Sequence, residues 1–168
     1  NMNREARLLD IYRRMEDHYG PQHWWPADTP FEVMVGAVLT QAVSWANVEK
    51  AITGLKAAGS MNPVALRDMS LEKLAPLLYP TRFYHAKAQK LKALVTYLGE
   101  RFEDDLDAMA GEDTSTLREE LLAVHGVGEE TADAILLYAL GKPAFVVDAY
   151  SRRVFRRLGL LPDRDTYA

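Results

Sequence analysis

The segment 117–148 constrains the fold of this 168-residue chain more than any other segment. Two stretches with helical spacing of apolar residues meet at Gly126-Val127-Gly128, and a short apolar run then leads to Asp148. Glycine tolerates positive φ and lets another backbone approach closely. The segment therefore predicts two short helices joined by a tight turn and followed by a single carboxylate.

Helical spacing of apolar residues also dominates the rest of the chain. Thr29 is expected to cap a helix with Pro30 in its first turn, and Thr116 and Glu119 are expected to form a capping box before the hairpin. No stretch alternates with period two, which favours an all-α class. Helices are expected over 3–19, 30–41, 44–58 and 84–102, with short ones after Asn62 and Ser70 and a last one over 149–158.

Composition and charge narrow the function classes. No apolar run is long enough to span a bilayer, and the absence of cysteine excludes a disulfide framework within these residues. The chain has a net charge of −4, but residues 140–168 carry six Lys or Arg against three Asp, a net of +3. The basic residues of that segment are Lys142, Arg152, Arg153, Arg156, Arg157 and Arg164. A local basic face matters more for phosphate binding than the total charge does.

The Gly-Val-Gly turn has two interpretations when it is taken alone. The glycines can serve the steric needs of an ordinary helical corner. They can also leave backbone N–H groups and a helix start pointing outward together, which binds a phosphate oxygen without reading the base sequence. The pattern by itself does not separate these interpretations.

Several motifs together resemble the helix–hairpin–helix and Gly/Pro-Asp signature of the endonuclease III superfamily of DNA glycosylases. They are Leu122-x-x-His125-Gly126-Val127-Gly128-x-x-Thr131-Ala132, Gly141-x-Pro143, Val146-Val147-Asp148, Phe31-Glu32 to Leu39-Thr40-Gln41, and Phe83-Tyr84-x-x-Lys87-Ala88, where Arg82 replaces the usual Gly. The resemblance implies a two-lobed, all-α helix–hairpin–helix glycosylase fold with the DNA site in the cleft between the lobes.

The resemblance also implies how the two lobes divide the chain. The central lobe is expected over 29–135, with its hairpin at 125–128. The second lobe is expected to combine 2–28 with 136–168. We expect part of this lobe to lie beyond Ala168, since the final residues contain no helix stop.

Asp148 matches the catalytic aspartate of the family. Cleavage of an N-glycosidic bond builds positive charge on the deoxyribose, which a carboxylate stabilises while it orients or deprotonates the attacking water. Asp148 could instead cap a helix or pair with Arg152, and capping is compatible with catalysis. Strand-nicking members carry a lysine nucleophile where this chain has Glu130. A carboxylate cannot form a Schiff base, so the resemblance implies a monofunctional enzyme that leaves an abasic site.

The aromatic residues resemble those of the bacterial 3-methyladenine DNA glycosylase III branch. In that branch, residues matching Trp25, Pro26 and Trp45 line the base pocket, and Glu occupies the position of Glu130. An alkylated purine is cationic and a good leaving group, so stacking and cation–π contact suit it. Trp24 is instead expected to pack in the core or between the lobes.

The resemblance implies a set of DNA contacts and a partner. Gln41 is expected to enter the duplex in the space of the flipped base, although a surface glutamine at a helix end is an equal alternative. The remaining expected DNA-binding residues are Gly126, Val127, Gly128, Thr131, Arg152 and Arg153. The expected partner is double-stranded damaged DNA, bound by a monomer with no membrane association.

Cofactor, location and alternative functions complete these expectations. We predict no metal site and no iron–sulfur cluster, because the branch generally lacks the cluster. We expect a cytoplasmic, nucleoid-associated protein. The alternatives are a glycosylase for oxidised or mismatched bases and a non-catalytic helix–hairpin–helix DNA-binding module.

Overall fold

The structure is a computed structural model that describes residues 3–161. Helices account for its regular structure, and residues 3–161 contain no β-strand, so the predicted all-α class is confirmed. The helices are α1 (Arg4–Tyr19), α2 (Pro30–Leu39), α3 (Trp45–Ala57), α4 (Pro63–Asp68), α5 (Leu71–Leu77), α6 (Tyr84–Phe102), α7 (Leu106–Gly111), α8 (Thr114–Ala123), α9 (Glu129–Ala134) and α10 (Ala149–Arg157), with a 3-10 turn η1 (Tyr79–Thr81) and a π-helical stretch η2 (Ile135–Ala139).

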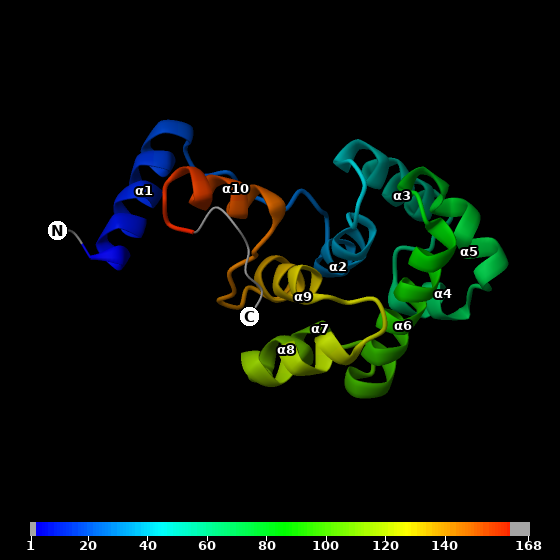
Figure 1. Ribbon diagram of the computed structural model, residues 1–168. Helices are drawn as coiled ribbons and strands as arrows, with labels where there is room; N and C mark the ends of the chain where they lie inside the picture. Colours follow the sequence, from blue (N-terminus) through cyan, green and yellow to red (C-terminus); the bar gives the residue numbers. More distant parts are fainter. Residues whose placement is uncertain (1–2, 162–168) are drawn as a thin grey trace.

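Helix α2 lies at the centre of the core. Every residue from Phe31 to Leu39 is buried, and all of them are apolar or glycine except Glu32, whose carboxylate pairs with Lys56 at 2.8 Å. It packs against α3, α6, α9 and η2, and Figure 1 shows α2 between α9 on one side and α3 on the other. The pocket described below therefore forms around the end of a rigid, buried helix.

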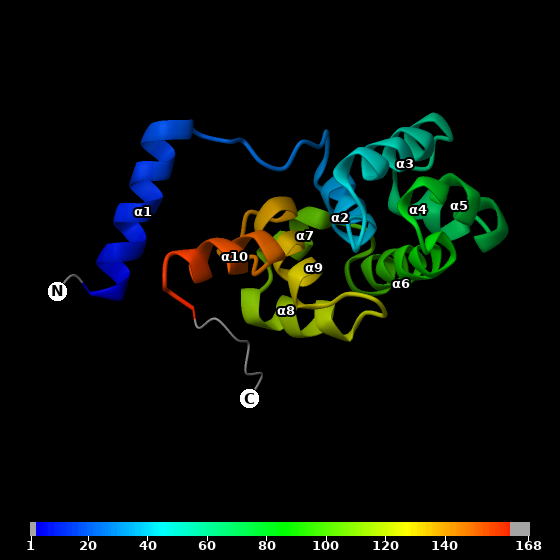
Figure 2. The same ribbon diagram turned by 45° about the horizontal axis from the view of Figure 1, so that its top comes forward.

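Helices α1 and α10 lie to one side of this body. Neither contains a buried residue, and Figures 1 and 2 show α1 set apart from α2 to α9. The Arg7 guanidinium at the start of α1 donates a hydrogen bond to the Leu158 carbonyl at the end of α10. The division into lobes at 29–135 stays a prediction, and residue 2 and residues 162–168 of the expected second lobe lie outside the described part of the chain.

Two details near the hairpin differ from the sequence-based expectation. The capping box at Thr116 and Glu119 is wrong, because α8 begins at Thr114 and Asp113 is its cap. The Asp113 carboxylate accepts hydrogen bonds from the Thr116 backbone N–H at 3.0 Å and from the Thr116 hydroxyl. Helix α7 was not expected, since its six residues are too few to show an apolar period. The Thr29 cap is confirmed, with the Glu32 N–H donating to Thr29 Oγ1 at 3.1 Å.

The buried ammonium of Lys87 predicts an unusual pH dependence of stability. Lys87 is 2% exposed, and its Nζ donates to the Thr81 carbonyl at 2.5 Å. Burial, helped by the charges of Lys90 and Arg82, lowers the pKa of Lys87 to about 8. A lysine in an unfolded chain keeps a pKa of roughly 10.4. Between these values the unfolded state binds more protons, so the free energy of unfolding should rise as pH increases from about 8 to about 10.

Denaturant unfolding across this pH range checks the prediction. The rise should be smaller in Lys87→Met, where Lys92 still contributes because burial also lowers its pKa, and fully retained in Lys73→Met, which removes an exposed lysine of α5. Tyr97 acts in the opposite direction, but only above pH 10, because burial and Glu120 raise its pKa. A Lys87→Met profile parallel to that of the wild type would contradict the assignment.

Candidate active site and DNA interface

A cavity of about 1180 Å³ opens between the turn that follows α2, the hairpin and the start of α10. It exceeds the roughly 300–1,000 Å³ that accommodates a small ligand, which suits a cleft that takes part of a polymer. The cavity brings together segments that are far apart in the sequence. Its lining includes Trp24, Trp25, Gln41, Trp45, Lys90, Gly126, Val127, Gly128, Glu130, Thr131, Tyr138 and Asp148.

Asp148 enters the cavity as the N-cap of α10. Its Oδ1 accepts hydrogen bonds from the Ser151 backbone N–H and the Ser151 hydroxyl, both at 2.7 Å. Its Oδ2 accepts no hydrogen bond within residues 3–161. The expected cap is thus confirmed, and it fixes the orientation of a carboxylate whose second oxygen can receive a proton from water.

Glu130 adds a second carboxyl group to the cavity from the first turn of α9. Burial of this group raises the pKa of Glu130, the negative charge of Asp148 raises it further, and Arg152 opposes the shift. Glu130 and Asp148 are therefore close enough to interact electrostatically. A cavity with two interacting carboxyl groups favours a ligand that carries positive charge.

The three tryptophans form one cluster at the wall of the cavity. The ring centroids of Trp25 and Trp45 are 5.3 Å apart in a T-shaped contact, and Trp24 lies 5.4 Å from Trp45. Trp24 does not pack in the core as one of the two expectations had it, because the residue is 50% exposed and lines the cavity, while its packing between the lobes stays a prediction. Pro26 follows Trp25 in the chain but is exposed and is not among the residues that line the cavity.

Trp25 rests against α2 at Gly36. A Cβ atom at Gly36 would lie 3.2 Å from Trp25 Cζ2, so glycine makes room for the indole. Tyr138, whose ring centroid is 5.6 Å from that of Trp25, continues the aromatic wall. It belongs to η2, where a π-helical turn departs from the helical period. Tyr138 was not predicted as a site residue, because its position in the sequence indicates an ordinary helix and not a π-helical turn.

The hairpin has the predicted geometry. Gly126 has φ of +82°, which favours glycine, and Val127 is 5% exposed and packs into the core. Gln41 is held against it, with Nε2 donating to the Gly126 carbonyl at 2.9 Å and to Thr131 Oγ1 at 3.0 Å. Thr131 is 6% exposed and Gln41 is half-buried, so this contact holds the Gln41 amide at the wall of the cavity.

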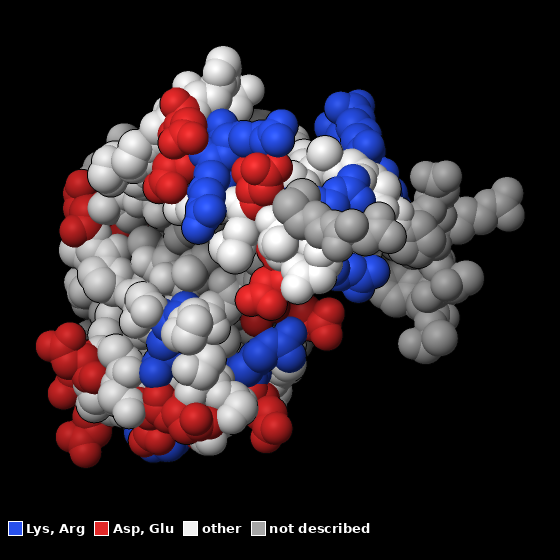
Figure 3. Space-filling view, turned by 90° about the vertical axis from the view of Figure 1, so that its left-hand side faces the viewer, with Lys and Arg blue, Asp and Glu red and all other residues white. Residues whose placement is uncertain are grey.

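The arginines of α10 are placed differently from one another. Arg152 lies near enough to Glu130 to lower the pKa of that carboxyl group, and the Arg153 guanidinium lies 5.6 Å from the Tyr150 ring centroid. Figure 3 shows acidic side chains close to the basic ones on the side of the molecule where α1 and α10 lie. Arg164, which contributes to the expected basic face, lies outside the described residues.

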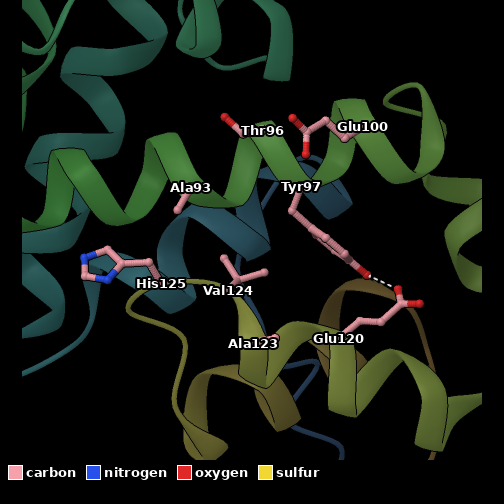
Figure 4. Close-up of a pocket in the computed structure, with 8 residues that line it drawn as sticks. All are labelled: Ala93, Thr96, Tyr97, Glu100, Glu120, Ala123, Val124 and His125. Carbon is pink, nitrogen blue, oxygen red and sulfur yellow. Dashed lines mark hydrogen bonds between the residues drawn. The ribbon is translucent and has the colours of Figure 1, made fainter.

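A smaller hollow of about 370 Å³ lies between α6 and α8. Figure 4 shows the Tyr97 hydroxyl directed at Glu120, to which it donates at 2.8 Å. His125 and Glu100 lie on its rim. None of the predicted site residues lines this hollow, so the larger cavity is the candidate site.

The described part of the chain offers neither a metal-binding cluster nor a membrane-spanning helix. Residues 3–161 contain no group of His, Asp or Glu side chains that could hold a metal ion, and the 168 residues include no Cys to ligate an iron–sulfur cluster. The expectation that the protein has no cluster stays a prediction. No helix within residues 3–161 is long and apolar enough to cross a membrane, and the cellular location stays a prediction.

Comparison with known proteins tests the resemblance of the motifs. The family model of the HhH-GPD superfamily base excision DNA repair proteins matches residues 35–168. The chain belongs to this superfamily. A Methanocaldococcus jannaschii protein named as a DNA repair glycosylase is 45% identical over 166 residues, which are 98% of this chain and 76% of that protein.

Solved structures of the HhH-GPD superfamily confirm the fold. The H. pylori 3-methyladenine DNA glycosylase MagIII, bound to 1,N6-ethenoadenine, superposes with a TM-score of 0.81 and 33% identity, covering 94% of this chain and 75% of that one. A trapped endonuclease III–DNA covalent intermediate superposes with a TM-score of 0.80 and 25% identity, covering 98% and 74%. The HhH-GPD chain described here is therefore a base excision repair DNA glycosylase.

Proposed function

We propose that this HhH-GPD protein is a monofunctional glycosylase that flips alkylated purines such as 3-methyladenine out of double-stranded DNA. It then hydrolyses the N-glycosidic bond. The observation that carries the proposal is that the tryptophan cluster shares one cavity with Asp148 and Glu130. The structural similarity to the H. pylori 3-methyladenine glycosylase supports the choice of base.

In the proposed reaction, the aromatic wall receives a cationic base. Electron-rich indole faces attract positive charge, and the carboxyl groups that line the same cavity add to this attraction. The T-shaped contact of Trp25 and Trp45 leaves no room for a base between the two rings. The base therefore stacks on an exposed ring face, or the rings part to admit it.

Asp148 supports the bond-breaking step. As the bond between the base nitrogen and C1′ breaks, its electron pair leaves with the base and positive charge grows on the sugar. The Asp148 carboxylate stabilises this charge, and Oδ2 accepts a proton from the water that attacks C1′. The products are the free base and an abasic site.

DNA contacts follow from the position of the hairpin. The backbone N–H groups around Gly126 and Gly128 bind a phosphate, Gln41 enters the duplex, and Arg152 and Arg153 attract the backbone. A monomer provides all of these groups from one chain.

Base release from a panel of DNA substrates tests the proposal. Methylated, oxidised and mismatched duplexes are incubated with the protein, and the free bases are identified by mass spectrometry. Release of 3-methyladenine supports the proposal. Release of oxidised or mismatched bases alone would favour the second candidate, a glycosylase for such bases. Duplex binding without release of any base would favour a non-catalytic module.

Because Glu130 stands in place of the lysine nucleophile, we expect no covalent intermediate between the protein and the sugar. Borohydride reduces a protein–sugar imine to a stable adduct, and an imine requires an amine nucleophile. We expect no borohydride-trapped complex when the protein processes methylated DNA, whereas endonuclease III should give one under the same conditions. A trapped adduct of this chain would contradict the monofunctional assignment.

A further inference from the structure

Lys90 occupies an unusual position for a lysine. Its aliphatic stem crosses the hairpin at Gly126, where a Cβ atom would lie only 2.1 Å from Lys90 Cγ. Its Nζ reaches the end of α2 and donates to Gln41 Oε1 at 2.5 Å. Lys90 therefore touches the turn that meets the phosphate and the glutamine that enters the duplex in the proposed function.

The charge of Lys90 is not neutralised within residues 3–161. No carboxylate there forms an ion pair with it, and its positive charge helps to lower the pKa of Lys87. Lys90 also lines the cavity beside Gly126 and Gly128. An ammonium group in this setting attracts a phosphate more strongly than it attracts an uncharged amide oxygen.

Both the nitrogen and the oxygen of the Gln41 amide form hydrogen bonds with other residues of the protein. Its two N–H groups are directed at Gly126 and Thr131, and its oxygen accepts from Lys90. An amide in this arrangement has to break several hydrogen bonds before it can contact DNA.

From these contacts, we propose that Lys90 is a phosphate ligand that also holds Gln41 until DNA arrives. Without DNA, the ammonium keeps the Gln41 side chain folded against the hairpin. A backbone phosphate at Gly126–Gly128 draws Lys90 away, and Gln41 is freed to enter the duplex. This inference rests on the proposed function, because it takes the hairpin and Gln41 as DNA contacts.

The salt dependence of duplex binding tests the phosphate contact. The probe is a fluorescent duplex with a non-cleavable abasic analogue, titrated between 50 and 200 mM KCl. Loss of one phosphate contact reduces the slope of log affinity against log salt by about 0.9. We expect this loss for Lys90→Met, retention of the slope in Lys90→Arg, and no change for Lys73→Met on α5. A Lys90→Met slope equal to that of Lys73→Met would overturn the inference.

A double variant tests the hold on Gln41. When Lys90→Met is made alone, the protein loses the phosphate contact, but it also no longer has to break the Lys90–Gln41 hydrogen bond to release Gln41. In a Gln41→Ala background only the loss of the phosphate contact remains. Lys90→Met should therefore weaken the affinity for the duplex at least threefold more in that background than it does alone. Equal effects of Lys90→Met in the two backgrounds would overturn the inference that Lys90 holds Gln41 in the absence of DNA. Thermal unfolding of each variant confirms that it is folded.

The two proposals fail in different ways. If the wild-type protein does not bind the duplex at 50 mM KCl, the proposed function fails. If the wild type binds and releases base but Lys90→Met behaves as Lys73→Met, only the inference about Lys90 fails.

Discussion

Asp148→Asn should reduce the release of alkylated purines by roughly 10²–10⁴-fold, the usual contribution of a positioned acid–base group. Asparagine cannot take the proton of the attacking water or provide a full negative charge beside the sugar. It caps a helix about as well as aspartate does, and its oxygen can still accept from Ser151. The loss should therefore appear in single-turnover base release from methylated DNA, with little change in thermal stability.

A matched control exists on another helix of the chain. Asp113 is the N-cap of α8, and its carboxylate accepts a hydrogen bond from Thr116 N–H. Asp113→Asn makes the same chemical change at the same kind of cap, and Asp113 does not line the cavity. We expect it to retain base release. An active Asp148→Asn variant would contradict the catalytic role, and equal losses in both variants would reduce the effect to helix capping.

Trp45→Leu should lower kcat/KM for release of cationic alkylpurines by roughly 5- to 150-fold. This range corresponds to the loss of about 1–3 kcal/mol of base–aromatic stacking. Leucine keeps an apolar side chain at the start of α3 but has no π face. Trp45→Phe keeps such a face and should lose much less activity. Release of 3-methyladenine and of an uncharged modified base is measured for each variant.

The charge of the base provides the discriminating comparison. If the indole acts through cation–π attraction, Trp45→Leu should impair release of the cationic base more than release of the neutral one. Tyr19→Leu, which removes an aromatic ring that is 70% exposed at the end of α1, should leave both rates unchanged. Equal losses for both bases would indicate that Trp45 shapes the cavity without sensing charge.

The sequence predicted the parts of the site whose spacing depends on local structure. The hairpin and the Asp148 cap depend on residues within a few positions of each other, so Gly126 and Asp148 were placed correctly. Trp24 was misplaced because a large aromatic side chain in a connection is usually buried. Whether it faces the core or a cavity depends on how the connection crosses α2.

Contacts between distant segments could not be predicted in this way. Lys90 lies 49 positions from Gln41 along the chain, and only the crossing of α6 over the hairpin brings their side chains together. Tyr138 was missed because the π-helical turn of η2 shifts the direction of its side chain. From the sequence pattern alone, Lys90 and Tyr138 would each lie on the surface of an ordinary helix.

The packing of Trp25 against α2 affects how a base can enter the cavity. Its indole N–H is buried without a hydrogen-bond partner in the described part of the chain, and an unsatisfied buried donor costs about 1–3 kcal/mol. The connection that carries it, residues 20–29, has no helix of its own. Exposing this N–H to water recovers that cost and offsets part of the apolar contact energy that holds the Trp25 ring. The aromatic wall can therefore open as a local unit while α2 stays packed, which allows the rings to part and admit a base between them.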